Sequence, residues 1–165
     1  MKIGLLSDTH SWLDDQVFHY FKDCDELWHA GDIGHLSVAK QLAAFKPLRA
    51  VYGNIDDQEI RRHYPARLFF MCEDLQVWMT HIGGKPPHYT SNILNILKKK
   101  APDVFVCGHS HILRVMQDPK HRKLLYLNPG AAGKEGFHQI RTLLRFEVHR
   151  KKISNVQAIE LGKKS

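Results

Sequence analysis

Hydrophobic runs that stop abruptly at polar residues are the most regular feature of the first third of the chain. Residues 2 to 7, 26 to 30 and 48 to 52 are mostly apolar, and a short polar segment follows each of them at once. Continuous apolar runs of this length are typical of buried strands in a parallel sheet. Between them, residues 14 to 22 and 35 to 45 carry apolar side chains at helical spacing. The pattern predicts alternating strands and helices in a parallel α/β sheet.

The second half of the chain favours a different arrangement. Residues 68 to 71 and 75 to 80 predict a hairpin, residues 89 to 100 predict a helix, and residues 103 to 107 predict another strand. Four further strands are expected in a second, largely antiparallel sheet, at residues 112 to 117, 123 to 127, 142 to 148 and 153 to 160. We therefore expect one domain over residues 1–165, in which two sheets pack together with helices outside.

Chemistry-bearing side chains gather in five clusters, each after a predicted strand and each beside a glycine or in a short turn. The clusters are Asp8-x-His10, Gly31-Asp32, Gly53-Asn54, His81-x-Gly83 and Gly108-His109-x-His111. In open α/β sheets the ligand site lies outside the carboxyl ends of the strands, so the clusters are expected at one edge. Residues two apart in an extended segment point to the same side, which predicts that Asp8 and His10 project together.

The types of side chain in these clusters indicate a metal site. Carboxylate and imidazole together suit manganese, iron, cobalt, nickel or zinc. Two Asp, four His and one Asn exceed what a single tetrahedral ion uses, whereas two ions that share a bridging carboxylate would use them all. Two ions roughly 3.5–4 Å apart can hold both the attacking and the leaving oxygen in a phosphoryl transfer.

The order of the five clusters resembles that of the calcineurin-like metallophosphoesterases. Within that superfamily it is similar to the short bacterial and archaeal phosphodiesterases of the YfcE and MJ0936 type. The resemblance extends from Asp8 to the Asn128-Pro129-Gly130 turn, which matches the family's Asn-Pro-Gly-Ser segment with Ala131 in place of Ser. It implies an α/β fold, a four-layer β-sandwich of two mixed sheets flanked by helices, as in metallo-dependent phosphatases.

The resemblance also implies a role for each residue. Asp8, His10 and His111 would hold one divalent ion, Asn54, His81 and His109 would hold the other, and Asp32 would bridge them. Catalysis would act through the metals, with Asp8, Asp32, Asn54 and His81 as the residues that carry it. The implied reaction is hydrolysis of phosphodiesters, or of phosphomonoesters, by a metal-bridging hydroxide. Mn²⁺ is the expected ion, with Ni²⁺, Co²⁺, Fe²⁺ and Zn²⁺ as alternatives.

Two positions depart from the family pattern. Larger relatives place a histidine after the Gly-Asn pair, as a candidate general acid, and the short relatives often have Cys there, but this chain has Ile55. Leaving-group protonation must then come from elsewhere, or the enzyme favours good leaving groups. Ile82 separates His81 from Gly83, where relatives have His-Gly directly. Asp56 is expected either to orient a ligand or the Asn54 loop, or to form a turn or helix cap.

Several other residues leave more than one interpretation open. His35 and His88 follow the site clusters and could reach a substrate phosphate, and Trp12 could stack on a substrate or simply pack. His29 and His138 have no clear role, and Asn128 reads as a turn residue near the site. The three cysteines Cys24, Cys72 and Cys107 are far apart and form no CxxC pair, so we expect buried thiols rather than disulfides.

Composition and charge limit the possible partners. The chain has 43% hydrophobic and 25% charged residues and a net charge of +7, as expected for a soluble protein that attracts phosphorylated substrates. A small phosphorylated substrate is the expected partner, a homo-oligomer is possible, and the apolar runs are too short for a membrane span. We expect a cytoplasmic protein, since the first strand leaves no room for a signal peptide. The alternatives are a scaffold like the retromer subunit of the same fold, or a nuclease that binds nucleic acid.

Overall fold

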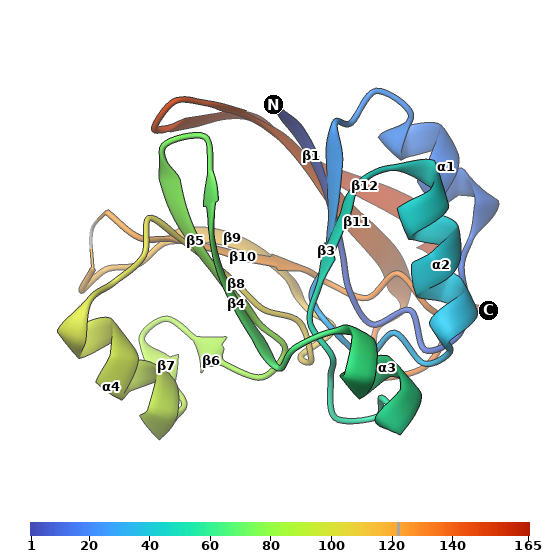
Figure 1. Cartoon of the computed structure of the whole chain (residues 1–165), viewed down its shortest axis with the longest axis horizontal. Helices are drawn as coiled ribbons and strands as arrows, with labels where there is room; N and C mark the ends of the chain where they lie inside the picture. Colours follow the sequence, from blue (N-terminus) through green and yellow to red (C-terminus); the bar gives the residue numbers. More distant parts are fainter. Residues whose placement is uncertain (122) are drawn as a thin grey trace.

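The predicted alternation of strands and helices in the first third of the chain is confirmed. The computed structural model describes residues 1–121 and 123–165 (Figure 1). Strands β1 (Lys2–Leu6), β2 (Glu26–His29) and β3 (Leu48–Ala50) are parallel neighbours. Helices α1 (Asp15–Phe21) and α2 (Leu36–Phe45) connect them and bury their apolar sides. The three predicted strands are therefore adjacent and parallel in one sheet.

The last two strands of the chain complete this same sheet. Strand β11 (Ile140–His149) pairs antiparallel with β1, and β12 (Lys152–Lys163) pairs with β11, which gives the order β12-β11-β1-β2-β3. The prediction that they belong to the second sheet is wrong. Periodicity shows which residues of a strand are buried but not which neighbour it pairs with. The free edge of β1 accepts β11, with Leu5 opposite Leu144.

The second sheet has five strands and contains both parallel and antiparallel pairs. The predicted hairpin is present as β4 (Arg67–Cys72) and β5 (Leu75–Thr80). The strand expected at residues 103 to 107 is β8 (Val104–Val106), which lies at the centre of the sheet. In sheet order the strands are β4 (Arg67–Cys72), β5 (Leu75–Thr80), β8 (Val104–Val106), β10 (Leu125–Pro129) and β9 (Leu113–Gln117).

Four further elements connect the two sheets or cover them. Helix α4 (Ser91–Lys99) agrees with the predicted helix, whereas α3 (Gln58–His63) and the small hairpin of β6 (Gly84–Lys85) and β7 (His88–Tyr89) were not predicted. Asp57 caps α3 by accepting the Ile60 N–H group at 3.0 Å. Each unpredicted element is only two to six residues long, too short for periodicity to reveal.

Three apolar clusters hold the layers together. One lies between the first sheet and α1 to α3, one lies between the two sheets, and one joins the second sheet to α4. Figure 1 shows the resulting order, with α1 and α2 outside the first sheet and α4 beyond the second. The expected four-layer arrangement of two mixed sheets and flanking helices is confirmed. The three cysteines are buried and free.

The carboxyl ends of strands from both sheets meet. The Asp8 N–H group donates to Gly31 O at 2.9 Å, which joins the loops after β1 and β2. His81, after β5, donates from Nδ1 to Ala30 O at 2.7 Å and so connects the two sheets. The Gly108 N–H group donates to His81 O at 3.1 Å and adds the loop after β8. Among the described residues, no helix is both long and apolar enough to cross a membrane.

The position of β11 predicts how much its residues contribute to stability. Leu144 is fully buried between the sheets, whereas Val156 on β12 is 38% exposed. We expect Leu144→Ala to lower the free energy of unfolding by about 3 kcal/mol, since a large buried side chain leaves a cavity. Val156→Ala is expected to change it by less than about 0.5 kcal/mol. Chemical denaturation measures both, and equal effects of the two substitutions would contradict a core position for β11.

Candidate metal centre

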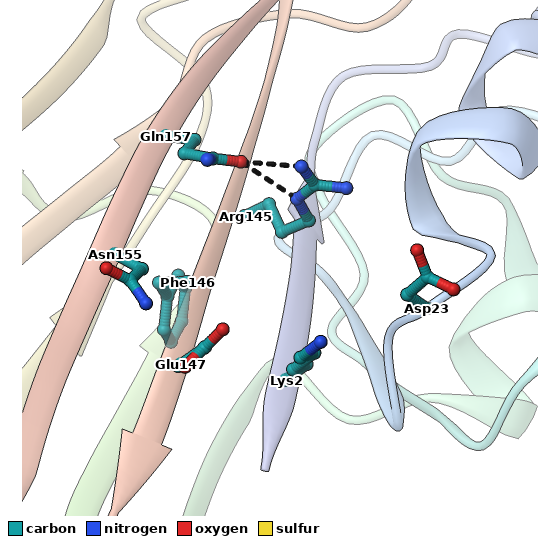
Figure 2. Close-up of a pocket in the computed structure, with 7 residues that line it drawn as sticks. All are labelled: Lys2, Asp23, Arg145, Phe146, Glu147, Asn155 and Gln157. Carbon is teal, nitrogen blue, oxygen red and sulfur yellow. Dashed lines mark hydrogen bonds between the residues drawn. The ribbon is translucent and has the colours of Figure 1, made fainter.

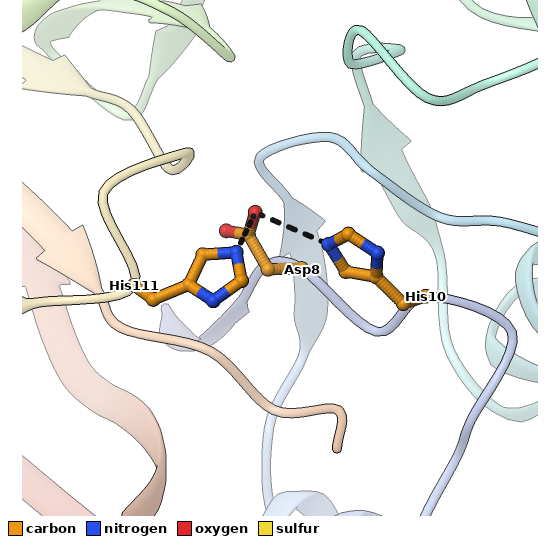
Figure 3. A group of neighbouring side chains, drawn as sticks. All are labelled: Asp8, His10 and His111. Atoms are coloured by element: carbon orange, nitrogen blue, oxygen red, sulfur yellow. Dashed lines mark ion pairs between the residues drawn. The ribbon is translucent and has the colours of Figure 1, made fainter. Parts of the chain in front are cut away.

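Two groups of three potential ligands lie where the strand ends meet. Asp8, His10 and His111 form one group, and in each group the potential ligand atoms lie within 4.8 Å of one another. Figure 3 shows the rings of His10 and His111 on either side of the Asp8 carboxylate. The second group consists of Asp32, His81 and His109.

Asp8 is fully buried, and its two oxygens have different surroundings. Oδ2 accepts the backbone N–H group of His109 at 3.1 Å. Oδ1 has no hydrogen-bond partner among the described residues and lies 3.1 Å from His111 Nε2 and 3.9 Å from His10 Nε2. His81 Nε2, from the other group, also lies 3.9 Å from Oδ1. One oxygen is thus fixed by the backbone, while the other faces three imidazole nitrogens.

Asp32 is built in the same way and lies between the two groups. Oδ1 accepts the Ile55 N–H group at 3.1 Å. Oδ2 lies 3.5 Å from His10 Nε2, in the first group, and 3.2 Å from His81 Nε2, in its own group. Asp32 Oδ2 therefore lies closer to nitrogen donors of both groups than Asp8 Oδ1 does, since that oxygen is 3.9 Å from His10 Nε2 and 3.9 Å from His81 Nε2.

The hydrogen bond that His81 makes with the backbone fixes its tautomer. Because a carbonyl oxygen can only accept, the contact with Ala30 O places the ring hydrogen on Nδ1. The lone pair is then on Nε2, which is buried, has no hydrogen-bond partner among the described residues and faces Asp32. A ring nitrogen fixed through the other nitrogen is the usual arrangement of a metal-binding histidine.

His138 fixes the tautomer of His111 through a second imidazole. His138 Nε2 lies 2.9 Å from Gly133 O, so this nitrogen carries the hydrogen and Nδ1 is an acceptor. His111 Nδ1 lies 3.1 Å from His138 Nδ1 and must therefore donate to it. The lone pair of His111 is then on Nε2, the atom that faces Asp8. The sequence left His138 without a role, because its partner is 27 residues away in the chain.

The backbone at these residues is left-handed. The φ angles of Asp8, His10, Asp32, His109 and His111 are 54°, 45°, 53°, 66° and 57°. The expectation that Asp8 and His10 leave an extended segment on the same side is therefore wrong, although both reach one cluster. This conformation costs an L-residue about 1–2 kcal/mol, and such strain concentrates at functional sites.

His29 holds two of the loops together from beneath. It is fully buried, accepts the Gly31 N–H group on Nδ1 at 3.2 Å, and donates from Nε2 to Thr9 Oγ1 at 2.9 Å. Thr9 Oγ1 in turn donates to Ile33 O at 2.9 Å. Burial lowers the pKa of His29 to about 4, so the ring is neutral.

Asp56 orients the loops rather than capping a helix. Its carboxylate accepts three backbone N–H groups, from Gly53 at 2.7 Å, Gly34 at 2.7 Å and Ile33 at 3.1 Å. These bonds join the loop that carries Asp32 to the loop that carries Asn54. Gly53 permits this close approach, because a Cβ atom there would lie 2.0 Å from Asp32 Oδ1.

Asn54 lies at the rim of the site and is exposed. It shares a hollow of about 200 Å³ with His81 and the exposed Ile82. The extra residue Ile82 therefore does not remove His81 from its cluster. Arg61 holds the Asn54 loop, since it donates from Nε to Asp56 O at 2.7 Å and lies over the Tyr52 ring at 4.7 Å.

The described residues fit two divalent ions. Buried donor atoms without hydrogen-bond partners occur in both groups: Asp8 Oδ1, His10 Nε2 and His81 Nε2. Ligands at ~2.1 Å from a common ion lie roughly 3.0–3.5 Å from one another. The closest nitrogen-to-oxygen distances here, 3.1 Å, 3.2 Å and 3.5 Å, have that spacing. Oxygen and nitrogen donors without a thiolate favour a transition metal.

Electrostatics at the site also favour bound cations. Burial would raise the pKa of Asp8, but the imidazoles of His10 and His111 outweigh it and lower the pKa. Burial would also raise the pKa of Asp32, but the contact with His81 outweighs it, so the pKa of Asp32 is lowered as well. Both carboxylates are therefore ionised. Burial lowers the pKa of His109 and favours its neutral, metal-binding form.

Other candidate residues have structural surroundings or lie beside the site. His35 caps α2, since its Nδ1 accepts the Ser37 N–H group at 3.2 Å. Trp12 packs under the Lys134 ammonium group, 3.8 Å from its ring centroid. Asn128 donates to Gly108 O at 2.9 Å and so supports the His109 loop. His88 lines a hollow next to His109.

A separate hollow of about 160 Å³ lies over the first sheet, away from all seven predicted ligands (Figure 2). Arg145 lines it, but its guanidinium already donates to Gln157 Oε1 at 2.6 Å and 3.0 Å and to Tyr20 O at 2.9 Å. These contacts make Arg145 a structural residue of the β11–β12 hairpin.

The fold and the two ligand groups together indicate a protein of the metallophosphoesterase class. Residues 1–151 match the calcineurin-like phosphoesterase superfamily domain. The chain belongs to this superfamily, and the resemblance seen in its motifs is confirmed.

Individual relatives agree with this assignment. The phosphodiesterase MJ0936 of Methanocaldococcus jannaschii is 30% identical over 146 residues, which cover 79% of this chain and 83% of that protein. A solved structure described as a novel archaeal phosphodiesterase superposes with a TM-score of 0.78 at 24% identity, over 98% of this chain and all of that one. Vps29 of Chaetomium thermophilum has the same fold, with a TM-score of 0.74 at 14% identity over 99% of each chain.

The contact between His138 and His111 gives a prediction. We expect His138→Ala to weaken divalent-ion binding at the Asp8 group by about 10–100-fold, since the partner that fixes a ligand's tautomer contributes that much. Calorimetric titration of the metal-free protein with Mn²⁺ measures the effect. His138→Gln should recover part of the affinity, because its amide can also donate to Gly133 O and accept from His111.

The control is His149→Ala, which removes an exposed histidine at the end of β11. It should bind Mn²⁺ as the wild type does. An unchanged affinity in His138→Ala would show that the contact between the two imidazoles does not position His111.

Proposed function

We propose that this chain is a phosphodiesterase that depends on two divalent ions. The observation that carries the proposal is the position of Asp32, whose Oδ2 lies between nitrogen donors of both clusters. Asp8, His10 and His111 would hold one ion, His81, His109 and Asn54 would hold the other, and Asp32 would bridge them. When bound, two such ions lower the pKa of water and neutralise charge on a phosphoryl group.

Two hollows next to the candidate site favour a diester over a monoester. His81 lines the hollow of about 200 Å³ with Asn54, and His109 lines another of about 280 Å³. The two rings lie 5.2 Å apart between their centroids. A phosphodiester centred between them can place one ester arm in each hollow, whereas a monoester has a single arm. In the reaction a water oxygen bonds to phosphorus as one ester P–O bond breaks, and the departing oxygen takes a proton.

The residue at position 55 affects the choice of leaving group. Ile55 is 46% exposed, and it supplies a backbone N–H group to Asp32 but no acidic side chain. Among the predicted ligands, the exposed His109 is the one whose imidazole lines the second hollow. We therefore infer that the enzyme works best on esters with good leaving groups, whose departure needs little protonation.

Removal of the bridging carboxylate tests the assignment. We expect Asp32→Ala to reduce hydrolysis of bis(p-nitrophenyl) phosphate to the rate measured without protein, because both ions lose a shared ligand. Glu160→Gln, which changes an exposed acid on β12, is the control and should retain activity. Near wild-type turnover by Asp32→Ala would refute the shared-metal assignment.

Metal removal gives a second test of the same proposal. Chelation followed by gel filtration should abolish hydrolysis of the diester, and addition of Mn²⁺ should restore it. Ni²⁺, Co²⁺, Fe²⁺ and Zn²⁺ are the other ions that the donor set accepts, and elemental analysis of the restored protein should give about two ions per chain. Full activity in the chelated protein would rule out the metal-dependent mechanism.

Partner binding is the second candidate function. The observation that favours it is the exposed apolar pair on the edge strand β4, where Phe69 is 63% and Met71 is 53% exposed. The complete donor set argues that such binding would accompany catalysis rather than replace it. Light scattering at several protein concentrations would detect a homo-oligomer, and steeply salt-dependent binding of RNA or DNA would support a nuclease instead.

A further inference from the structure

The hollow next to His109 is lined by a lysine and an arginine. It has a volume of about 280 Å³ and shares Gly108, His109 and Ser110 with the candidate metal centre. Its other charged or titratable side chains are Lys85, His88 and Arg114, and no Asp or Glu is among the described residues that line it. Pockets that enclose drug-sized ligands measure roughly 300–1,000 Å³, so this one has room for a single arm of a small ester.

The side chains of Lys85, His88 and Arg114 come to this hollow from two parts of the fold. Lys85 and His88 are directly opposite each other in the β6–β7 hairpin, so their side chains leave on the same face. Arg114 pairs with Asn128 across β9 and β10, and the Asn128 amide holds the His109 loop. Two elements remote in sequence thus bring positive charge to one side of the second ligand group.

The floor of the hollow is fixed in position. Gly84 O accepts the Tyr126 hydroxyl at 2.8 Å, and Gly83 O accepts the Thr90 N–H group at 3.1 Å. A Cβ atom at Gly83 would lie 2.6 Å from the Phe105 ring, so a side chain at this position would force the floor to move. The segment that carries Lys85 and His88 is therefore held in place.

Lys85 and Arg114 have no carboxylate partner within 4.0 Å among the residues that the structure describes. The other hollow is lined by Arg61, which already donates to Asp56 O and Asn54 O, and by Arg67, which has no carboxylate partner within 4.0 Å in the described part of the chain. The hollow next to His109 has two such groups, Lys85 and Arg114. Positive groups without an anionic partner beside a phosphate-binding centre are suited to a second anion on the substrate.

We propose that Lys85, His88 and Arg114 form a subsite for a phosphate group carried on one ester arm of the substrate. This inference rests on the proposed function and makes it more specific. The substrate class is then a small phosphodiester with a second, terminal phosphate, such as a short phosphorylated oligonucleotide end. The two metals hold the scissile phosphate, and the subsite holds the terminal one.

Dinucleotides that differ in one phosphate test the subsite. The Mn²⁺-loaded full chain is assayed on TpT, pTpT and TpTp, which share the same scissile diester and place the added phosphate at either end. We expect one of the phosphorylated forms to have a kcat/KM at least about tenfold above that of TpT, mainly through a lower KM, since a charge-assisted contact contributes that much or more. Arg114→Gln and Lys85→Gln should each remove most of this preference.

The matched control is Lys99→Gln, which removes one exposed positive charge on α4, outside the hollow. It should keep the wild-type preference, which separates a local subsite from general attraction by net charge. Equal kcat/KM values for all three dinucleotides, or equal loss of preference in all three variants, would overturn the subsite. Hydrolysis of bis(p-nitrophenyl) phosphate is measured in parallel. If it is absent with every metal, the proposed function itself fails, whereas if it is present without a phosphate preference, only the subsite is wrong.

Discussion

The burial of two carboxylates beside one another is the constraint on which the rest of this site depends. Asp8 is fully buried and Asp32 is 2% exposed, and each lies within 3.5 Å of an imidazole nitrogen. A buried charge without a partner costs several kcal/mol. The backbone supplies one N–H group to each carboxylate and leaves the other oxygen facing histidines. Bound cations would be partners for the carboxylate oxygens that accept no backbone N–H group. The stability of the loops and the chemistry of the site therefore depend on the same atoms.

The two sheets make this arrangement possible because they deliver loops that bond to one another. Left-handed residues recur in these loops, and each one costs about 1–2 kcal/mol in an isolated chain. Hydrogen bonds between loops, such as those accepted by Asp56 and made by His29, hold the strained conformations in place. The strands beneath are fixed by an apolar layer shared between the sheets, which contains Leu5, Met79 and Leu144. Strain at the site is thus supported by packing elsewhere, as is usual where function demands an unfavourable backbone.

Much of the fold and of the ligand clusters could be predicted from the sequence, because both depend on local patterns. An apolar run that ends at Asp8 or at Gly31-Asp32 marks a strand end and a ligand together. Long-range choices could not be predicted: β11 pairs with β1 rather than with the second sheet, a partner that periodicity does not specify. The same limit hid His138, since nothing in the sequence near Gly136-Phe137 indicates a contact with His111. The left-handed backbone of Asp8 could not be predicted, because a loop without glycine gives no clear sequence signal of a positive φ angle.

The location of the positive charge decides between a broad nucleic-acid surface and a local anion site. The net charge is +7, yet several arginines are bonded within the protein: Arg49 with Glu26, Arg141 with Asp14, Arg145 with Gln157 and Arg61 with Asp56. Much of the guanidinium charge therefore stabilises strands and loops. Lys85 and Arg114 line one hollow beside the second ligand group, and Arg67 lines the other, where Arg61 is already bonded. Charge held at a fixed distance from the candidate metal centre favours anions of matching length, which a long basic surface does not do.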